Sequence, residues 1–251
     1  VDILVVPEGI VSVLTDRNYN PAFEYMLEYL ANKDFEKILI GSPRASLKDA
    51  RYYFHNSLFH FNADGGFLSY YDKVNLVPFG EYNPYLRVIP SLAAKKNFAK
   101  GQRENTIMKL DADLWAVPLI CYDGIFPGKF SQDGDFLLNV TNDIWFTRKI
   151  FNKNISVGPW QHFDLIRMRA VEEGKPLVRV ANYGITAMVD SFGHIDESLN
   201  FDDDEQLLKV NLPPKLEERT FYNQYRNLLF YLAFILNAVA LFIYYQVRKS
   251  K

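Results

Sequence analysis

Five residues carry the groups that acyl transfer through a thiol would need. Cys121 is the only cysteine among 251 residues and follows the apolar run LWAVPLI. A lone thiol is a modest nucleophile at neutral pH and needs a base or a cation nearby. Glu8 follows the apolar run ILVVP, and Lys73 and Glu81 lie in the segment YYDKVNLVPFGEY. Asp123 stands two residues after the thiol. A thiol, a carboxylate base and an ammonium that stabilises an oxyanion would together form a complete acyl-transfer site.

Each of these residues also has an ordinary structural interpretation. Free cysteine is among the most buried residue types, so Cys121 could be a core residue. Glu8 could be a charge at the start of a helix, and Lys73 and Glu81 could be solvated loop residues. The backbone N–H of Tyr122, directly after the thiol, could supply a further oxyanion donor. Residue types and spacing alone leave both interpretations open.

Composition argues against several other kinds of site. The formal charge of −2 gives no electrostatic footprint for nucleic acid. One cysteine excludes an internal disulfide and a cysteine-rich metal site, and it fits either a reducing compartment or a catalytic thiol outside the cell. His55 and His60 are five residues apart, so a strand would place them on opposite faces. The sequence has no glycine-rich phosphate loop of standard spacing. We therefore expect no metal, no cofactor and no nucleic-acid partner.

Short strand-like runs alternate with helical patterns, which favours a layered α/β fold, most simply as one large domain. Two hairpins are expected, one around the Asp64-Gly65 turn and one that ends at Cys121. The segments that we predict to be strands are 2–7, 37–43, the two hairpins in 52–73 and 106–121, 135–142 and two within 177–195. Helical spacing is found in 23–33 and in 159–176, and the second ends at Gly174 and Pro176.

The C-terminal segment has the composition of a membrane-spanning helix. Leu228 to Val247 is a run of 20 residues without a charge, which as a helix would span about 30 Å. Tyrosine and phenylalanine flank both ends, as in an aromatic belt. The run is apolar all round, whereas a buried core helix usually keeps a polar stripe. The basic tail 248–251 favours a cytoplasmic end and the rest of the chain outside, although Arg219 and Arg226 on the other flank weaken that assignment.

Several blocks occur in an order that resembles the nitrilase-like part of the apolipoprotein N-acyltransferases, within the carbon-nitrogen hydrolase superfamily. They are PEG, KVNLVPFGEYNP, LICYDGIFP, NVTNDIWF and GPWQHFDLIRMRAVEEGKPLVRVANYGITAMVDSFG, followed by the apolar C-terminal segment. The blocks LVPFGEY and GPWQHF…RMRA…NYGIT are specific to this family within the superfamily. The resemblance covers essentially the whole chain.

The resemblance implies a nitrilase-like αββα sandwich followed by one C-terminal transmembrane helix. It places a catalytic domain over 1–215, a transmembrane helix over 228–247 and a basic tail over 248–251. The family has a first strand-helix unit and membrane spans before the PEG block, so we expect this chain to be either a fragment of a longer protein or an unusually truncated relative. Two departures from the family pattern are Asp123, where Glu is usual, and extra residues from Thr147 to Val157, which we expect in a loop.

Site residues follow from the matched motifs. The resemblance places the base at Glu8, the lysine at Lys73 and the nucleophile at Cys121. Glu81, Tyr122 and Asp123 are expected to assist or to hold the oxyanion. The substrate pocket is expected to include Phe79, Tyr82, Asn142 and Trp145. With Tyr85 and Phe146, the loop aromatics would form an apolar rim that embeds in lipid.

The reaction implied is a two-step acyl transfer in the bacterial cytoplasmic membrane, with the catalytic domain on its periplasmic face. Cys121 would take an acyl chain from a phospholipid and pass it to the N-terminal amine of a diacylglyceryl-cysteine lipoprotein. Two alternatives remain: a membrane-anchored amidase that transfers the acyl group to water, and an inactive lipid-binding fragment.

Overall fold

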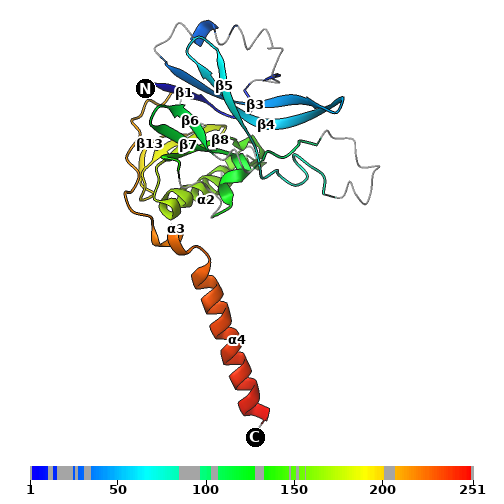
Figure 1. The fold of residues 1–251 in the computed structure, drawn as a ribbon, viewed down its shortest axis with the longest axis vertical. Coiled ribbons are helices and arrows are strands. Elements are labelled where there is room, and N and C mark those ends of the chain that lie inside the picture. Colours follow the sequence, from blue (N-terminus) through cyan, green and yellow to red (C-terminus); the bar gives the residue numbers. More distant parts are fainter. Residues whose placement is uncertain are drawn as a thin grey trace.

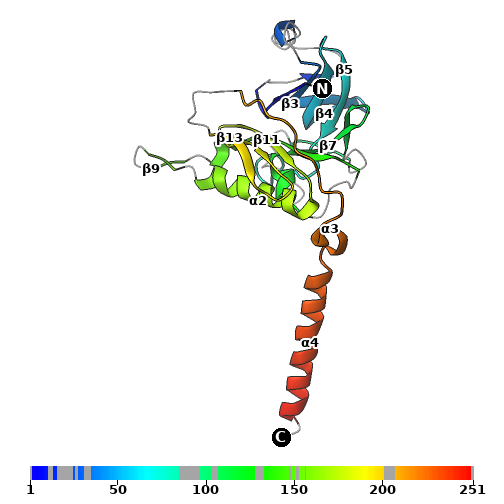
Figure 2. The same ribbon diagram turned by 90° about the vertical axis from the view of Figure 1, so that its left-hand side faces the viewer.

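A computed structural model describes most of the chain (Figure 1). The described residues are 2–10, 14–15, 25, 28–30, 35–84, 97–102, 107–127, 133–146, 148–150, 153–155, 157–200 and 207–249. Figures 1 and 2 show a globular sandwich of two sheets, from which one long helix projects. Of the helix predicted over 23–33, only residues 25 and 28–30 are described, and these are helical.

The first sheet contains five strands within the described residues, with β1-β3-β4-β5 as its order and β2 pairing with β3. β1 runs parallel to β3, whereas β3, β4 and β5 are antiparallel neighbours. The strand bounds are β1 Ile3–Val6, β2 Leu14–Thr15, β3 Lys37–Lys48, β4 Arg51–Asn62 and β5 Phe67–Asp72. β3 extends five residues beyond its apolar run because its outer half pairs with β4 across the Asp49-Ala50 turn.

The second sheet has six strands within the described residues, in the order β13-β12-β11-β8-β7-β6. Its centre, β7-β8-β11, is parallel, so these three strands end at the same edge. The bounds are β6 Met108–Asp111, β7 Leu114–Ile120, β8 Phe136–Asn142, β11 Leu177–Asn182, β12 Thr186–Val189 and β13 Ile195–Leu199. Short 3₁₀ turns follow two of them, η3 Cys121–Ile125 and η4 Asp143–Phe146.

Three apolar clusters define the layers. Leu39, Leu58 and Tyr71 of the first sheet meet Leu138 and Val140 of the second in the core between the sheets. On the outer side of the second sheet, Phe163, Ile166 and Ala170 of α2 (Val157–Glu173) pack on strand residues. On the outer side of the first sheet, Leu30 from helical residues 28–30 packs on Ile38, Ile40, Phe59 and Phe61. The layering confirms the expected αββα sandwich.

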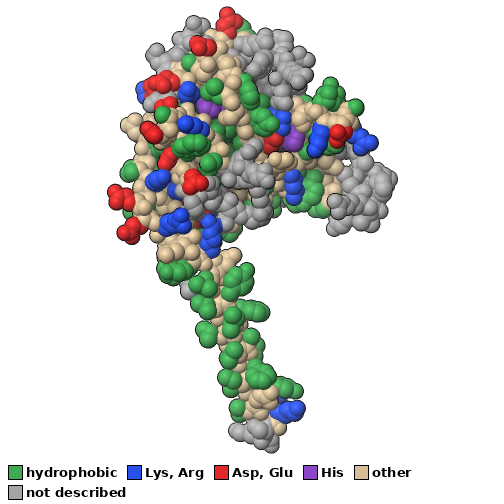
Figure 3. Space-filling model, in the orientation of Figure 1, with side chains coloured by type: hydrophobic (Ala, Val, Ile, Leu, Met, Phe, Trp, Pro, Cys, Tyr) green, Lys and Arg blue, Asp and Glu red, His purple; other side chains and the backbone are tan. Residues whose placement is uncertain are grey.

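The C-terminal part consists of two helices, α3 (Phe221–Tyr225) and α4 (Leu228–Lys249). Thr220 caps α3 by accepting a hydrogen bond from the Asn223 N–H. α4 contains the one candidate membrane span among the described residues, Phe230–Lys249, with a mean hydropathy of 1.8 and none of its window buried. Apolar side chains cover the face of the helix that Figure 3 shows, and basic side chains lie at its end. Its Asn237 amide is satisfied within the helix by the Ala233 carbonyl, at 2.8 Å.

The extra residues from Thr147 to Val157 are more regular than the expected loop. Within their described part, β9 (Arg148–Ile150) and β10 (Lys153–Ile155) form an antiparallel pair, and Val157 already begins α2. The pair projects from the sandwich beside the start of α2 (Figure 2). The insertion therefore adds a short hairpin after η4.

Candidate active site

The thiol stands where β7 gives way to a tight 3₁₀ turn. Cys121 has a φ of +47°, in the left-handed region that a residue with a Cβ rarely adopts. Such a conformation costs of order 1–3 kcal/mol, so packing on both sides must hold it. The side chain is 7% exposed and belongs to the core between the two sheets. The apolar strand β7 thus places one almost completely buried thiol at the carboxyl ends of the parallel strands.

Glu8 reaches the same edge from the other sheet. It follows β1 by two residues, and its backbone passes β3 so closely that a Cβ on Gly41 would lie 2.8 Å from the Glu8 Cα. Its carboxylate accepts two hydrogen bonds. Glu8 Oε1 accepts from the Asn56 amide at 2.6 Å, and Glu8 Oε2 accepts from the Asn142 N–H at 2.9 Å. The second bond joins the first sheet to the end of β8 in the second.

Lys73 and Glu81 form a buried ion pair beside Glu8. Lys73 directly follows β5 and is 1% exposed, and its Nζ donates to Glu81 Oε1 at 2.9 Å. The other Glu81 oxygen accepts from the Val77 N–H at 2.8 Å. The Asn56 amide also donates to Glu81 Oε1, at 2.8 Å. The structure therefore brings Glu8, Lys73 and Glu81 together.

Charges in this cluster act on the thiol. Burial raises the pKa of Cys121 to about 11; the Glu8 charge adds to this, and the Lys73 charge opposes it. Burial also raises the pKa of Glu8, although Lys73 and Asn56 oppose it. For Lys73, burial would lower the pKa, but the charges of Cys121, Glu8 and Glu81 together outweigh it and raise the pKa. The resting thiol is neutral at physiological pH, next to a carboxylate that can take its proton and a cation that stays charged.

Asp123 is tied into the turn that carries the thiol. One oxygen accepts from the Tyr71 hydroxyl at 2.9 Å, and the other accepts from the Asn75 N–H at 2.6 Å. The Ile120 N–H donates to Asp123 as well, at 3.3 Å. These bonds fasten the start of η3 to the segment after β5. With its oxygens committed in this way, Asp123 is better suited to hold Cys121 in position than to contact a substrate.

The residues predicted for the substrate pocket lie around the end of the sandwich that holds Cys121 and Glu8. Asn142 ends β8 and contacts Glu8 through its backbone. Trp145 of η4 is 82% exposed and Phe79 is 62% exposed, with φ at +62°. Tyr82 is half-buried, and its carbonyl accepts from the Phe79 N–H at 2.7 Å. Phe146 of η4 is also exposed, whereas Tyr85 of the predicted rim lies outside the described residues.

A second polar cluster behind the thiol was missed by the sequence analysis. Arg179 of β11 is fully buried and donates to Asp143 Oδ2 at 2.6 Å. His162 of α2 contacts Asp143 Oδ1 through Nδ1 at 2.9 Å, and Thr141 of β8 donates to the same oxygen at 2.9 Å. Asn139 accepts a further bond from Arg179. An arginine within the apolar run LVRVAN was the available signal, because charges inside buried strands need partners.

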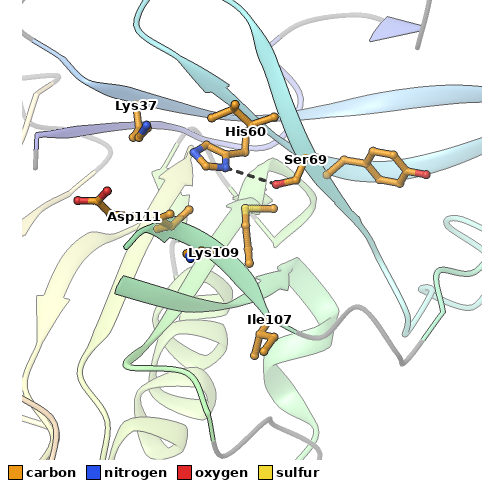
Figure 4. A pocket seen from close by; sticks show the side chains of 10 residues that line it. Lys37, His60, Ser69, Ile107, Lys109 and Asp111 are labelled. Atoms are coloured by element: carbon orange, nitrogen blue, oxygen red, sulfur yellow. Dashed lines mark hydrogen bonds between the residues drawn. The ribbon is translucent and has the colours of Figure 1, made fainter. Parts of the chain in front are cut away.

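The cavity in Figure 4 is separate from this cluster. It has a volume of about 500 Å³, and Lys37, His60, Ser69, Ile107, Lys109 and Asp111 are among the residues that line it. Lys37 pairs with Ile3 at the start of β1, and Met108 pairs with Ala116 near the start of β7. Glu8 and Cys121 follow the opposite ends of those strands. The cavity therefore lies at the far end of the sandwich from the thiol.

Taken together, the cluster can support nucleophilic attack by a thiol on a carbonyl carbon. It supplies a nucleophile, a carboxylate to accept the proton and a fixed cation for the charge that develops on oxygen. Among the described residues, no three His, Cys, Asp or Glu side chains are grouped as metal ligands would be.

Comparison with known proteins shows the family of the chain. A family model described as carbon-nitrogen hydrolase matches residues 1–218. The chain is 39% identical over 168 residues to an apolipoprotein N-acyltransferase of Bradyrhizobium diazoefficiens, covering 63% of this chain and 30% of that protein. It is 32% identical over 253 residues to the protein of the same name from Agrobacterium fabrum, covering 96% of this chain and 45% of that protein. The chain thus spans between about a third and a half of the length of these curated relatives.

Solved structures with the same fold are more distant in sequence. A carbon-nitrogen hydrolase from Helicobacter pylori superposes with a TM-score of 0.57 at 15% identity, over 81% of this chain and 75% of that one. Saccharomyces cerevisiae Nit3, a member of branch 10 of the nitrilase superfamily, gives 0.55 at 18% identity, over 79% and 72%. At these identities the likeness concerns the fold alone.

Proposed function

The chain belongs to the carbon-nitrogen hydrolase family, and we propose that it is the catalytic part of an apolipoprotein N-acyltransferase. The single observation that carries the proposal is the cluster in which Lys73 pairs with Glu81 beside Glu8. The charges of Glu8 and Lys73 in this cluster shift the pKa of the Cys121 thiol. The names of its relatives supply the substrate class. Residues 1–215 would be the catalytic domain, 228–247 the transmembrane helix and 248–251 the basic tail.

In the first half-reaction, the Cys121 sulfur attacks the acyl ester carbon of a phospholipid. Glu8 takes the thiol proton as the carbon–sulfur bond forms, so the base removes a proton that a thiol with a pKa of about 11 would keep. The tetrahedral intermediate then collapses, and the carbon–oxygen bond breaks. Glu8 returns the proton to the leaving alcohol oxygen. The products are a Cys121 thioester and a lysophospholipid.

In the second half-reaction, the α-amine of a diacylglyceryl-cysteine lipoprotein attacks the thioester carbon. An α-amine has a reference pKa near 8, so a neutral fraction is present at physiological pH and Glu8 needs to remove one proton during attack. The carbon–sulfur bond breaks, Cys121 regains a proton from Glu8, and the product is an amide on the lipoprotein. No cofactor is needed, because both steps exchange one acyl bond for another.

Lys73 and the Tyr122 N–H would stabilise the oxyanion in both steps. Glu81 holds the Lys73 ammonium in place through Oε1 and is itself anchored by the Val77 N–H. A cation fixed before the reaction stabilises charge in the transition state without reorganising, and a single donor of this kind is typically worth about a hundredfold or more in rate. Asp123 would act indirectly, by holding the turn that presents Cys121.

Lipid substrates call for a site next to a bilayer. We propose that α4 spans the bacterial cytoplasmic membrane and that the sandwich lies on its periplasmic face, with Arg248 and Lys249 at the cytoplasmic end. Phe79, Tyr82, Trp145 and Phe146 would embed in lipid beside the site and keep water from the thioester. Protease added to sealed spheroplasts should digest the sandwich of the membrane-bound protein, and full protection would reverse this orientation.

Trapping the intermediate tests the proposed nucleophile. The chain, incubated with phospholipid vesicles, should gain the mass of one acyl group, and neutral hydroxylamine should remove it. An adduct that persists in Cys121→Ala would contradict the proposal. A thioester also forms in an amidase of this family, so the fate of the acyl group has to be measured separately.

A further inference from the structure

Three buried ionisable residues lie directly behind the nucleophile and have no role in the two half-reactions proposed above. Asp143 and Arg179 are completely buried and His162 is 5% exposed. Burying charges is expensive unless they are closely paired, and such groups are seldom the most stabilising choice for a core. Their position next to the end of β7 suggests that they serve the thiol.

Asp143 is held as a carboxylate by two partners. Arg179 Nη2 donates to Oδ2 at 2.6 Å, and the His162 Nδ1 lies 2.9 Å from Oδ1, to which it must donate because a carboxylate only accepts. Burial alone would raise the pKa of Asp143, but the His162 hydrogen bond and the Arg179 charge outweigh it and lower the pKa. Asp143 therefore stays paired with Arg179 and His162 even when any third hydrogen bond to it is lost.

That further bond comes from Thr141, which also contacts the thiol. The Thr141 hydroxyl is completely buried and donates to Asp143 Oδ1 at 2.9 Å. Ile120 and Val140 are paired in the parallel ladder of β7 and β8, so the next residues, Cys121 and Thr141, are neighbours at the strand ends. From this position the Thr141 hydroxyl acts on Cys121 as a hydrogen-bond partner that lowers the thiol pKa, against the larger opposing effect of burial. A hydroxyl has one proton, so it can donate to Asp143 or to the sulfur but not to both.

We infer that Thr141 is a positioning residue whose hydroxyl proton points to Asp143 while Cys121 is a thiol, and turns to the sulfur as Glu8 takes the thiol proton. No covalent bond of Thr141 breaks. The proton leaves the sulfur for Glu8, one hydrogen bond to Asp143 is lost, and one to the thiolate is gained. The inference rests on the proposed role of Cys121 as nucleophile.

The exchange matters because it stabilises only the charged form of the sulfur. The neutral thiol is faced by negative charges on Glu8 and Asp143 and by positive charges on Lys73 and Arg179, with Glu81 beyond Lys73 and His162 beyond Asp143. Once Glu8 has taken the thiol proton it is neutral, and Asp143 remains as the nearest negative charge that faces the thiolate. When the Thr141 hydroxyl turns away from Asp143, its proton, which carries a partial positive charge, faces the negative sulfur. In the thioester the sulfur is neutral again, and the hydroxyl can return to Asp143.

Alkylation of the single thiol tests this without depending on acyl transfer. The rate of reaction of the full chain with iodoacetamide would be measured against pH for the wild type, Thr141→Val and Thr141→Ser. Valine has nearly the shape of threonine but no hydroxyl, and we expect it to raise the thiol pKa by about one unit, which lowers the rate at pH 9 about tenfold. Serine keeps the hydroxyl and should restore most of the rate. Should Thr141→Val fail to fold, Thr141→Ala removes the same hydroxyl with a smaller side chain.

Thr186→Val provides a matched control in the same sheet. The Thr186 hydroxyl accepts from the Ala181 N–H at 3.1 Å, so its loss tests the general effect of removing a threonine hydroxyl. This control should leave the alkylation profile unchanged. A wild-type profile in Thr141→Val, or a serine variant no faster than valine, would overturn the inference and assign Thr141 a purely structural role. Failure of acyl transfer in the wild type would overturn the proposed function instead, while the alkylation result would still stand.

Discussion

Glu8 and Glu81 share one hydrogen-bond donor. The Asn56 amide nitrogen lies 2.6 Å from Glu8 Oε1 and 2.8 Å from Glu81 Oε1, so one side chain of β4 bridges both carboxylates. Lys73 is also held by Asn56, because the Lys73 backbone N–H donates to the Asn56 backbone carbonyl at 2.8 Å. The base and the carboxylate that holds the lysine are thus positioned by a residue that needs no direct contact with substrate.

Removing the Asn56 side chain should slow the acylation of Cys121. Asn56→Ala leaves two carboxylates without their common donor, so we expect thioester formation to slow by about tenfold or more, since a hydrogen bond to a charged group is worth about 1.5–3 kcal/mol. Single-turnover acylation from labelled phospholipid measures it. Asn62→Ala, at the other end of β4, removes an acceptor of the Gly66 N–H and should acylate normally. Equal rates for the two variants would show that the Asn56 bridge is dispensable.

Glu8→Gln should change two reactions of the same thiol in opposite directions. The Glu8 charge helps to raise the pKa of Cys121 to about 11, so removing that charge lowers this pKa and should speed alkylation by iodoacetamide at pH 8 severalfold. Removing the base should slow thioester formation by about a hundredfold, in the range for general-base catalysis. Slower alkylation together with slower acylation would point to misfolding, which thermal unfolding of the variant would reveal.

Alkaline pH should destabilise the folded chain through the same thiol. Its pKa is about 11 when folded against 9.0 for an unperturbed thiol, so between these values the unfolded chain has lost a proton that the folded chain retains. The free energy of unfolding should therefore fall as pH rises from 9 to 11, by up to about 2–3 kcal/mol. Lys73, whose pKa is raised above 10.5, stabilises below that value, and its contribution is lost as pH rises through the folded pKa. Urea unfolding of wild type and Cys121→Ala measures the part that depends on the thiol, because the variant lacks both the thiol proton and the Cys121 charge that raises the pKa of Lys73, and it should show a shallower decline.

The buried Arg179–Asp143 pair should be needed for folding stability. Arg179→Met removes the partner of a fully buried carboxylate, which typically costs about 3–5 kcal/mol. Urea denaturation in detergent micelles measures the loss. Lys215→Met breaks the half-exposed pair with Asp135 and should cost no more than about 1 kcal/mol. Similar losses in both variants would argue that the buried pair has no special role.

How far the site could be predicted depended on where each residue stands in the chain. Cys121, Glu8 and Lys73 each follow an apolar strand at a sheet edge, so local pattern and motif placed them. Asn56 and Arg179 lie inside strands and meet their partners across 25 to 48 residues, which no local pattern encodes. Their signal was a polar side chain inside a buried strand, and only the register of the strands shows what it contacts.

The same limit applies to the fold. The runs of 2–7 and 135–142 and the two strands within 177–195 are apolar because both faces of those strands are covered, and they were predicted as strands. The outer half of β3 was missed because its sequence RASLK has no apolar strand pattern, and the whole of β13 was missed because it is exposed; the strand character of both depends on pairing with β4 and β12. The β9-β10 pair in the insertion was missed because its polar sequence resembles a loop.

The proposed function requires that the acyl group on Cys121 passes to an amine rather than to water. The direct measurement loads the chain with labelled phospholipid in vesicles and then chases it with buffer alone or with a diacylglyceryl-cysteine peptide. An N-acyltransferase should show a long-lived thioester in buffer, rapid discharge to the peptide as an amide, and no discharge to an N-acetylated peptide, whose nitrogen is no longer a nucleophile. Discharge in buffer as fast as with the peptide, with free fatty acid as the product, would rule out the acyltransferase and make the chain a hydrolase.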